Sequence, residues 1–117
     1  MFLNQSLLVL VTIATGVMAD WGHVSCTPGT FPGPCGGGGC ASQPVHRIQL
    51  TINGQPCWGP FKTGGCGLLG NGVHDGTSKF ECGRNVDVWK TADGCWNLNI
   101  DGKHAYCCVS GGCDFTF

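Results

Sequence analysis

Apolar and polar residues alternate along residues 47–52, which is the pattern of a half-buried β-strand. The Asn53-Gly54 pair that follows predicts a tight hairpin turn. Because Pro56 and Pro60 interrupt the returning segment, we expect its strand to be short, irregular or at a sheet edge. The apolar members of the alternation are Ile48, Leu50 and Ile52.

The last third of the chain contains further strand patterns separated by turn residues. We predict an antiparallel meander of four strands, at residues 85–91, 95–100, 103–109 and 113–117. The turns fall at residues 92–94, at Asp101-Gly102 and at residues 110–112.

The hydrophobic pattern also predicts the register of this meander, because a shift of one residue would turn every side chain to the opposite face. A two-residue turn at Asp101-Gly102 and a three-residue loop at residues 92–94, with Gly94 left-handed, keep the apolar side chains together. The predicted pairs are Ile100 with Lys103, Leu98 with Ala105, Trp96 with Cys107, Val88 with Leu98 and Val86 with Ile100.

The opposite face of the predicted meander carries aromatic and planar polar side chains. Amides and carboxylates form hydrogen bonds in defined directions and aromatic rings offer flat apolar surfaces, a mixture suited to sugars. The alternative is that this face is buried under the N-terminal segment, held there by disulfides of Cys95 and Cys108. The candidate ligand-binding residues are Asp87, Trp89, Asn97, Asn99, His104 and Tyr106.

Two other parts of the chain give weaker patterns. Residues 21–43 are rich in glycine and proline, and we expect an irregular segment there. Residues 61–79 are also rich in glycine, which disfavours a helix longer than a single turn.

The N-terminus resembles an export signal. Residues 7–17 are apolar, and Val17 and Ala19 are placed where signal peptidase requires small residues, so we predict a signal peptide at residues 1–19. Residues 20–117 then form a single disulfide-stabilised β domain of a secreted, extracellular protein.

The chain has ten cysteines, an even number that favours complete disulfide pairing in an exported protein. Export and the absence of a paired C-x2-C spacing argue against the alternative of a zinc site, and we expect neither a metal nor a cofactor. The cysteines are Cys26, Cys35, Cys40, Cys57, Cys66, Cys82, Cys95, Cys107, Cys108 and Cys113.

The charge balance disfavours several kinds of partner. Six basic and seven acidic residues give a net charge of −1 without a cluster of either sign, so we expect neither nucleic-acid binding nor membrane insertion. Glu81, Arg84 and His104 could form a ribonuclease-like site, but such a trio occurs by chance in many small proteins. We therefore predict no catalytic residues.

In its export signal, small size, abundant glycine and ten cysteines with the adjacent Cys107-Cys108 pair, the chain resembles the small secreted cysteine-rich proteins of filamentous fungi. That group includes effectors directed at a host, killer toxins and compact lectins. The chain differs from hydrophobins in its number of cysteines and of adjacent cysteine pairs. The resemblance is one of composition and assigns no role to any residue.

The sequence thus predicts a small, disulfide-rich, mostly β protein with an antiparallel, sandwich-like sheet. We expect it to bind rather than to catalyse, with an extracellular or cell-wall carbohydrate as its ligand. The alternative is an effector or toxin that contacts a host or competitor protein through the same face or through Phe115 and Phe117. The oligomeric state is left open.

Overall fold

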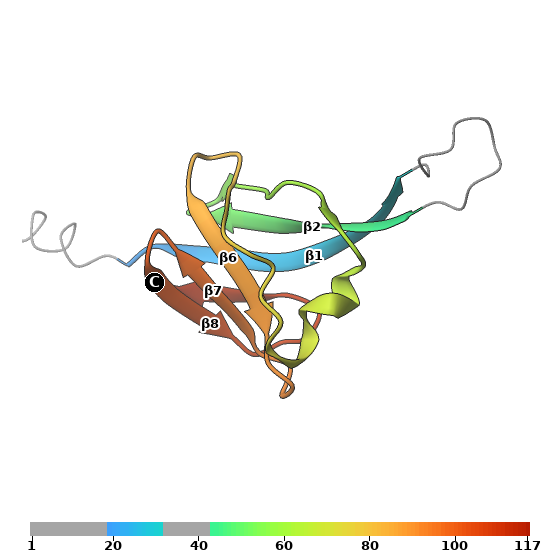
Figure 1. Cartoon of the computed structure of the whole chain (residues 1–117). Helices are drawn as coiled ribbons and strands as arrows, with labels where there is room; N and C mark the ends of the chain where they lie inside the picture. Colours follow the sequence, from blue (N-terminus) through green and yellow to red (C-terminus); the bar gives the residue numbers. More distant parts are fainter. Residues whose placement is uncertain (1–18, 32–42) are drawn as a thin grey trace, which may run out of the picture.

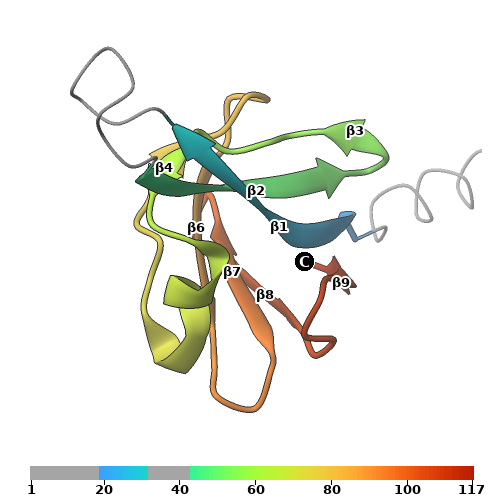
Figure 2. The ribbon, with the colours of Figure 1, turned by 90° about the vertical axis from the view of Figure 1, so that its right-hand side faces the viewer.

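The computed structural model describes residues 19–31 and 43–117, and within them the chain forms two antiparallel β-sheets packed face to face. Figure 1 shows the long strands β1 and β2 crossing behind the sheet that contains β6, β7 and β8, and Figure 2 shows the two sheets after a turn of 90°. The predicted class, a small, disulfide-rich and mostly β fold, is confirmed.

The first sheet is built around β2 (Gln43–Ile52). Ile48, Leu50 and Ile52 are buried, as the alternation predicts. Asn53 and Gly54 both have positive φ, as a two-residue hairpin turn requires, and the returning strand β3 (Gln55–Pro56) is short and at an edge. A second short strand, β4 (Lys62–Thr63), pairs with the beginning of β2.

The prediction of an irregular segment at residues 21–43 is wrong for its first part, since β1 (Trp21–Phe31) is a strand that pairs with β2 from Gly22 onward. Its inward positions hold Gly22, Val24 and Cys26, of which Val24 alone is a residue typical of strands, so the strand pattern is weak. Pro28 is tolerated because β9 pairs only with residues 21–24, so β1 has a single neighbour at Pro28. Residues 32–42, with Cys35 and Cys40, lie outside the described residues.

The second sheet has the order β5-β6-β7-β8, and its members are β5 (Ser78–Lys79), β6 (Asn85–Lys90), β7 (Trp96–Ile100) and β8 (Lys103–Cys107). Every register pair predicted for the last three strands is confirmed. Asp101 and Gly102 both have positive φ, and so has Gly94, as the two predicted turns require.

The loop between β6 and β7 contains Asp93. Hydrogen bonds from the Thr91 hydroxyl and the Cys95 N–H lower the pKa of its carboxylate.

The predicted fourth strand of the meander, β9 (Cys113–Thr116), belongs to the other sheet, where it pairs with β1. The alternation of apolar and polar residues correctly predicts that Cys113 and Phe115 are buried, but it does not specify which strand pairs with β9. The prediction was wrong because β1 was not recognised as a strand that could receive it. By leaving the meander, β9 connects the two sheets at one side of the sandwich.

The core lies between the two sheets. Leu69 and Phe80 join it from outside the strands, and Phe115 joins it from β9. The indole of buried Trp96 donates to the carbonyl of Ser110 at 3.1 Å. The strand residues that form it are Val24, Ile48, Leu50, Ile52, Val86, Val88, Trp96, Leu98, Ile100 and Ala105.

All eight cysteines within the described residues are paired. Cys26–Cys66 ties β1 to the 3-10 segment η1 (Cys66–Gly72), and Cys57–Cys82 ties the segment after β3 to the turn before β6. Cys95–Cys108 closes the β7–β8 hairpin, and Cys107–Cys113 links β8 to β9. The adjacent pair Cys107 and Cys108 thus serves two bridges, because neighbouring residues of an extended chain point to opposite sides.

Segment 61–79 contains little regular structure, as expected. The η1 segment is interrupted at Gly70 and Asn71, where φ and ψ are not helical, and Asn71 has a φ of 61°. Its buried Leu69 is the side chain through which this segment joins the core.

Candidate functional site

The six candidate residues lie together on the outer face of the second sheet, as predicted. Asp87 and Trp89 come from β6, Asn97 and Asn99 from β7, and His104 and Tyr106 from β8. The register aligns them in two rows across the strands, which are Asp87, Asn99 and His104 in one row and Trp89, Asn97 and Tyr106 in the other.

Aromatic rings form a continuous row across this face. The ring centroids of Trp89 and His104 lie 5.9 Å apart with planes 20° from parallel, and those of His104 and Tyr106 lie 6.1 Å apart with planes 16° from parallel. A fourth ring, that of His74, stacks on Trp89 with centroids 4.0 Å apart. We call His74, Trp89, His104 and Tyr106 the ring row.

His74 comes from outside the three strands and was not among the predicted residues. The segment that carries it runs beside β6, where the Asp75 N–H donates to the carbonyl of Val88 at 2.8 Å and the Gly76 N–H donates to Asp87 Oδ1 at 3.0 Å. In this extended segment successive side chains point to opposite sides, so His74 reaches the outer face while Asp75 points inward. Only the pairing with β6 places His74 there, and no periodicity in residues 61–79 indicates it.

Hydrogen bonds hold the polar members of the face. Nδ1 of His74 donates to Oδ2 of Asp87 at 2.5 Å, and Nε2 of His104 donates to Oδ1 of Asn97 at 2.9 Å. The Asp87 side chain is only 15% exposed, so its carboxylate is a fixed acceptor at the edge of the face. These bonds orient the two imidazoles before any ligand arrives.

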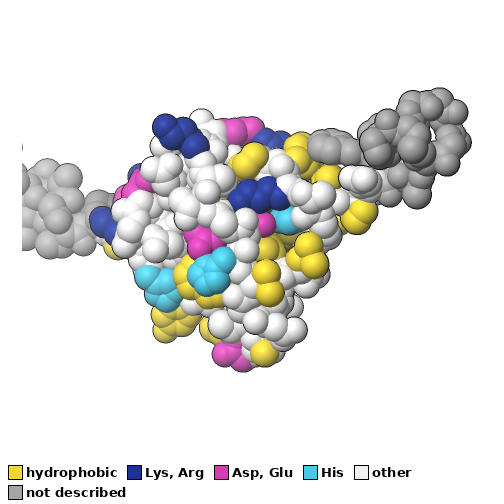
Figure 3. All heavy atoms as spheres, viewed as in Figure 1, with side chains coloured by type: hydrophobic (Ala, Val, Ile, Leu, Met, Phe, Trp, Pro, Cys, Tyr) yellow, Lys and Arg dark blue, Asp and Glu magenta, His cyan; other side chains and the backbone are white. Residues whose placement is uncertain are grey.

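The face is open to solvent. Tyr106 is 64% exposed and the His74 side chain 52%, while His104 and Asn99 are also exposed and Trp89 is partly covered by His74. Figure 3 shows histidine and hydrophobic side chains gathered on this side of the molecule. The accessible rings are therefore those of His74, His104 and Tyr106, with Trp89 beneath the first of them.

The alternative of a face covered by the N-terminal segment is wrong for the described part of that segment. Residues 21–31 are strand β1 of the opposite sheet, and Cys95 and Cys108 pair with each other. No described cysteine of the N-terminal segment is bonded to this face, since Cys26 pairs with Cys66.

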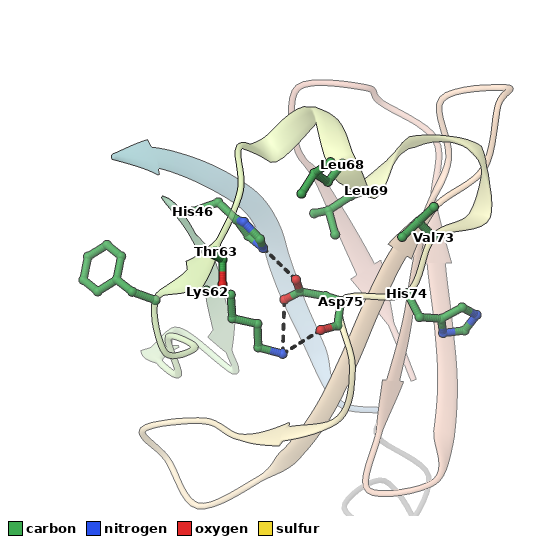
Figure 4. Close-up of a pocket in the computed structure, with 9 residues that line it drawn as sticks. His46, Lys62, Thr63, Leu68, Leu69, Val73, His74 and Asp75 are labelled. Atoms are coloured by element: carbon green, nitrogen blue, oxygen red, sulfur yellow. Dashed lines mark hydrogen bonds and ion pairs between the residues drawn. The ribbon is translucent and has the colours of Figure 1, made fainter. Parts of the chain in front are cut away.

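A hollow of about 470 Å³ lies on the other side of the segment that carries His74. Figure 4 shows Asp75 pointing into it toward His46 and Lys62, while His74 points away. Nε2 of His46 donates to Asp75 Oδ1 at 2.6 Å and Nδ1 donates to the carbonyl of Gly64 at 2.8 Å. Lys62 Nζ donates to the carbonyls of Asp75 and Gly76.

This buried network has a structural role. The side chains of His46 and Asp75 are 3% and 7% exposed, and Lys62 Nζ lies 3.4 Å from Asp75 Oδ2. Each charged group is matched by a partner of the other sign or by a carbonyl, so the network fixes the loop that carries His74 against β2 and β4.

The residues considered for a ribonuclease-like site each have a different partner. Glu81 pairs with Arg47, Arg84 Nη1 lies 3.7 Å from Asp101 Oδ2, and His104 bonds to Asn97. The structure therefore offers no shared site through which these three would act together.

Within residues 19–31 and 43–117, no group of three or more histidine, cysteine or acidic side chains is arranged to hold a metal ion. No helix in this described part of the chain has the length and apolar character needed to span a membrane.

Comparison of the chain with protein-family models, with curated proteins and with solved structures finds no match. The interpretation of the site therefore rests on the chemistry of the ring row and its polar neighbours.

Proposed function

We propose that this is a secreted, disulfide-stabilised binding protein that recognises a neutral carbohydrate of extracellular or cell-wall origin through the outer face of the second sheet. The observation that carries the proposal is the ring row, four nearly parallel rings bordered by Asp87, Asn97 and Asn99. On this open face exposed rings and oriented polar groups occur together.

The chemistry of the face matches that of a sugar. The C–H surfaces of a pyranose pack against aromatic rings, and its hydroxyl groups both donate and accept hydrogen bonds. Asn99 offers a donor and an acceptor, the Asp87 carboxylate accepts, and the histidines add ring nitrogens. The carboxylate and the net charge of −1 disfavour acidic polysaccharides.

The disulfides support the predicted compartment. Four bridges within a small domain are typical of oxidising environments, which is where cell-wall and extracellular glycans occur. Secretion and a place among the small cysteine-rich fungal proteins, as a compact lectin, are parts of this proposal.

A glycan array tests the proposal, using oligosaccharides of glucose, N-acetylglucosamine and mannose with sulfated and uronic-acid glycans as the charged set. We expect binding to a neutral class that falls about tenfold or more in Tyr106→Ala, since the loss of one well-packed aromatic contact costs about 1.4 kcal/mol or more. Phe61→Ala is the matched control, because Phe61 is a half-exposed aromatic that lines the hollow beside Asp75. Binding to no glycan, or equal loss in the two variants, contradicts the proposal.

A second candidate is an effector or toxin that binds a protein. It is favoured by three large apolar side chains that line the hollow beside Asp75 and are about half exposed, namely Phe61, Leu68 and Val73. Leu68→Asp together with Val73→Asp would abolish binding to such a partner and leave glycan binding unchanged. The array and this double variant therefore separate the two candidates.

A further inference from the structure

The ring row ends at a second hollow, and Tyr106 is the one of the six candidate ligand-binding residues that lines it. This hollow, of about 420 Å³, lies where β8 of one sheet adjoins β9 of the other, and it is lined by Trp21, Gly22, Tyr106, Asp114, Phe115 and Thr116. Tyr106 belongs both to the ring row and to the wall of the hollow. The two features are therefore continuous on the surface.

The lining repeats the chemistry of the ring row. Trp21 is 51% exposed and Tyr106 64%, so the hollow has an exposed aromatic side chain from each sheet. Asp114 and Thr116 occupy the outward positions of β9, alternating with the buried Cys113 and Phe115. They contribute a carboxylate and a hydroxyl group, both of which form hydrogen bonds with sugar hydroxyls.

The Asp114 carboxylate is both held in one orientation and accessible to solvent. Its Oδ1 accepts a hydrogen bond from Nδ1 of His23 at 2.8 Å, while the side chain is 90% exposed. A ligand hydroxyl can reach the carboxylate without displacing His23. A negative charge here, as at Asp87, disfavours an anionic ligand.

Trp21 is held in place by the hairpin turn at the end of β2. Its N–H donates to Oδ1 of Asn53 at 3.0 Å, and its carbonyl accepts from the N–H of Asn53 at 2.8 Å. Its ring lies against Gly54, where an added Cβ would be 3.5 Å from Trp21 Cη2. The aromatic wall is thus formed before binding, which lowers the entropic cost of ordering it.

We propose that this hollow is a further sugar subsite and that the natural ligand is an extended neutral oligosaccharide, an inference that rests on the proposed function. One part of the oligosaccharide lies along the ring row. The chain then passes Tyr106, and a distal sugar unit enters the hollow between Trp21 and Tyr106, with its hydroxyls bound to Asp114 and Thr116. A disaccharide on the ring row does not reach this subsite.

Calorimetric titration with disaccharides and hexasaccharides of β-linked glucose, N-acetylglucosamine and mannose tests this inference. For the series that binds, the wild-type protein should prefer the hexasaccharide, and Trp21→Ala should lose about tenfold in hexasaccharide affinity with unchanged disaccharide affinity. Trp21→Phe, which keeps an aromatic ring, should retain most of the preference. Tyr106→Ala should weaken both ligands, since Tyr106 belongs to both features.

The outcomes separate the two proposals. Disaccharide and hexasaccharide binding that Trp21→Ala leaves untouched would overturn the subsite while the ring row stands. Equal loss of both ligands in Trp21→Ala, with a folded variant by circular dichroism, would also overturn it. Failure of the wild-type protein to bind any of the six oligosaccharides would overturn the subsite together with the proposed function.

Discussion

The imidazole of His74 stacks on the indole of Trp89, with ring centroids 4.0 Å apart and planes 24° from parallel. This contact brings a loop residue onto a face otherwise formed by three strands. It also changes the role of Trp89, which supports His74 from below while Tyr106 and His104 present the more open surface.

The stack should stabilise the fold as well as the face. His74→Ala removes both the ring contact and the hydrogen bond to Asp87, and we expect a loss of about 1 kcal/mol in the free energy of unfolding. His23→Ala is the matched control, since His23 also bonds to an aspartate and is 48% exposed but does not belong to the ring row. Its loss should stay within about 0.5 kcal/mol. Equal losses in urea titrations would show that the stack contributes nothing.

The buried pair of His46 and Asp75 should contribute far more to the free energy of unfolding than an exposed pair of histidine and aspartate. Asp75→Asn leaves His46 and Lys62 without their carboxylate in a buried site, and we expect a loss of about 3 kcal/mol or more. Asp114→Asn, which alters the exposed pair with His23, should cost less than about 1 kcal/mol. Chemical denaturation of both variants measures the difference, and a similar small loss in each would contradict a structural role for the network.

Much of this architecture could be predicted from the local sequence pattern. The parts that could not be predicted were missed for physical reasons. Alternation and turn residues were enough to place the registers of β6, β7 and β8, because each neighbour in that sheet is also a neighbour in sequence. The strand β1 was missed because it contains Gly22 and Pro28, which are rare in strands.

The site residues that lie on predicted strands could be predicted from the sequence, and those that come from other parts of the chain could not. Alternation and the register of the three strands place Asp87, Trp89 and Tyr106 on one face. His74 instead arrives through a loop whose position depends on the buried contact of Asp75 with His46. Trp21 joins Tyr106 only because β9 pairs with β1, a contact between the two ends of the described chain. Such long-range pairings leave no periodic signal in a single sequence.

Gly22 shows why β1 needs a small residue at one inward position. An added Cβ would lie 2.3 Å from the carbonyl oxygen of Thr51 and 2.7 Å from Cζ of Phe115. We expect Gly22→Ala to cost about 2 kcal/mol through overpacking. Gly65→Ala is the control, because nothing lies within 4 Å of its added Cβ and its φ is −85°. Thermal unfolding of the two variants should differ clearly, and equal melting temperatures would contradict the close packing of β1.

The adjacent cysteines provide a test of the sheet assignment. Cys107 pairs in register with the buried Trp96 and is bonded to Cys113, while Cys108 points the other way and is bonded to Cys95. Mass spectrometry with fragmentation between residues 107 and 108 should recover Cys107–Cys113 and Cys95–Cys108. The exchanged pairing, Cys95–Cys107 with Cys108–Cys113, would place β9 differently and contradict the two-sheet arrangement.

The central claim is that the ring row binds a neutral glycan, and nuclear magnetic resonance tests it most directly. Isotope-labelled protein is titrated with the neutral oligosaccharide that gives the strongest array signal. We predict that the shifts concentrate at the Trp89 indole N–H, at the His74 imidazole and at the outward positions of β6, β7 and β8. Shifts confined to Phe61, Leu68 and Val73 in the hollow beside Asp75, or to the outer face of β2, would contradict the account.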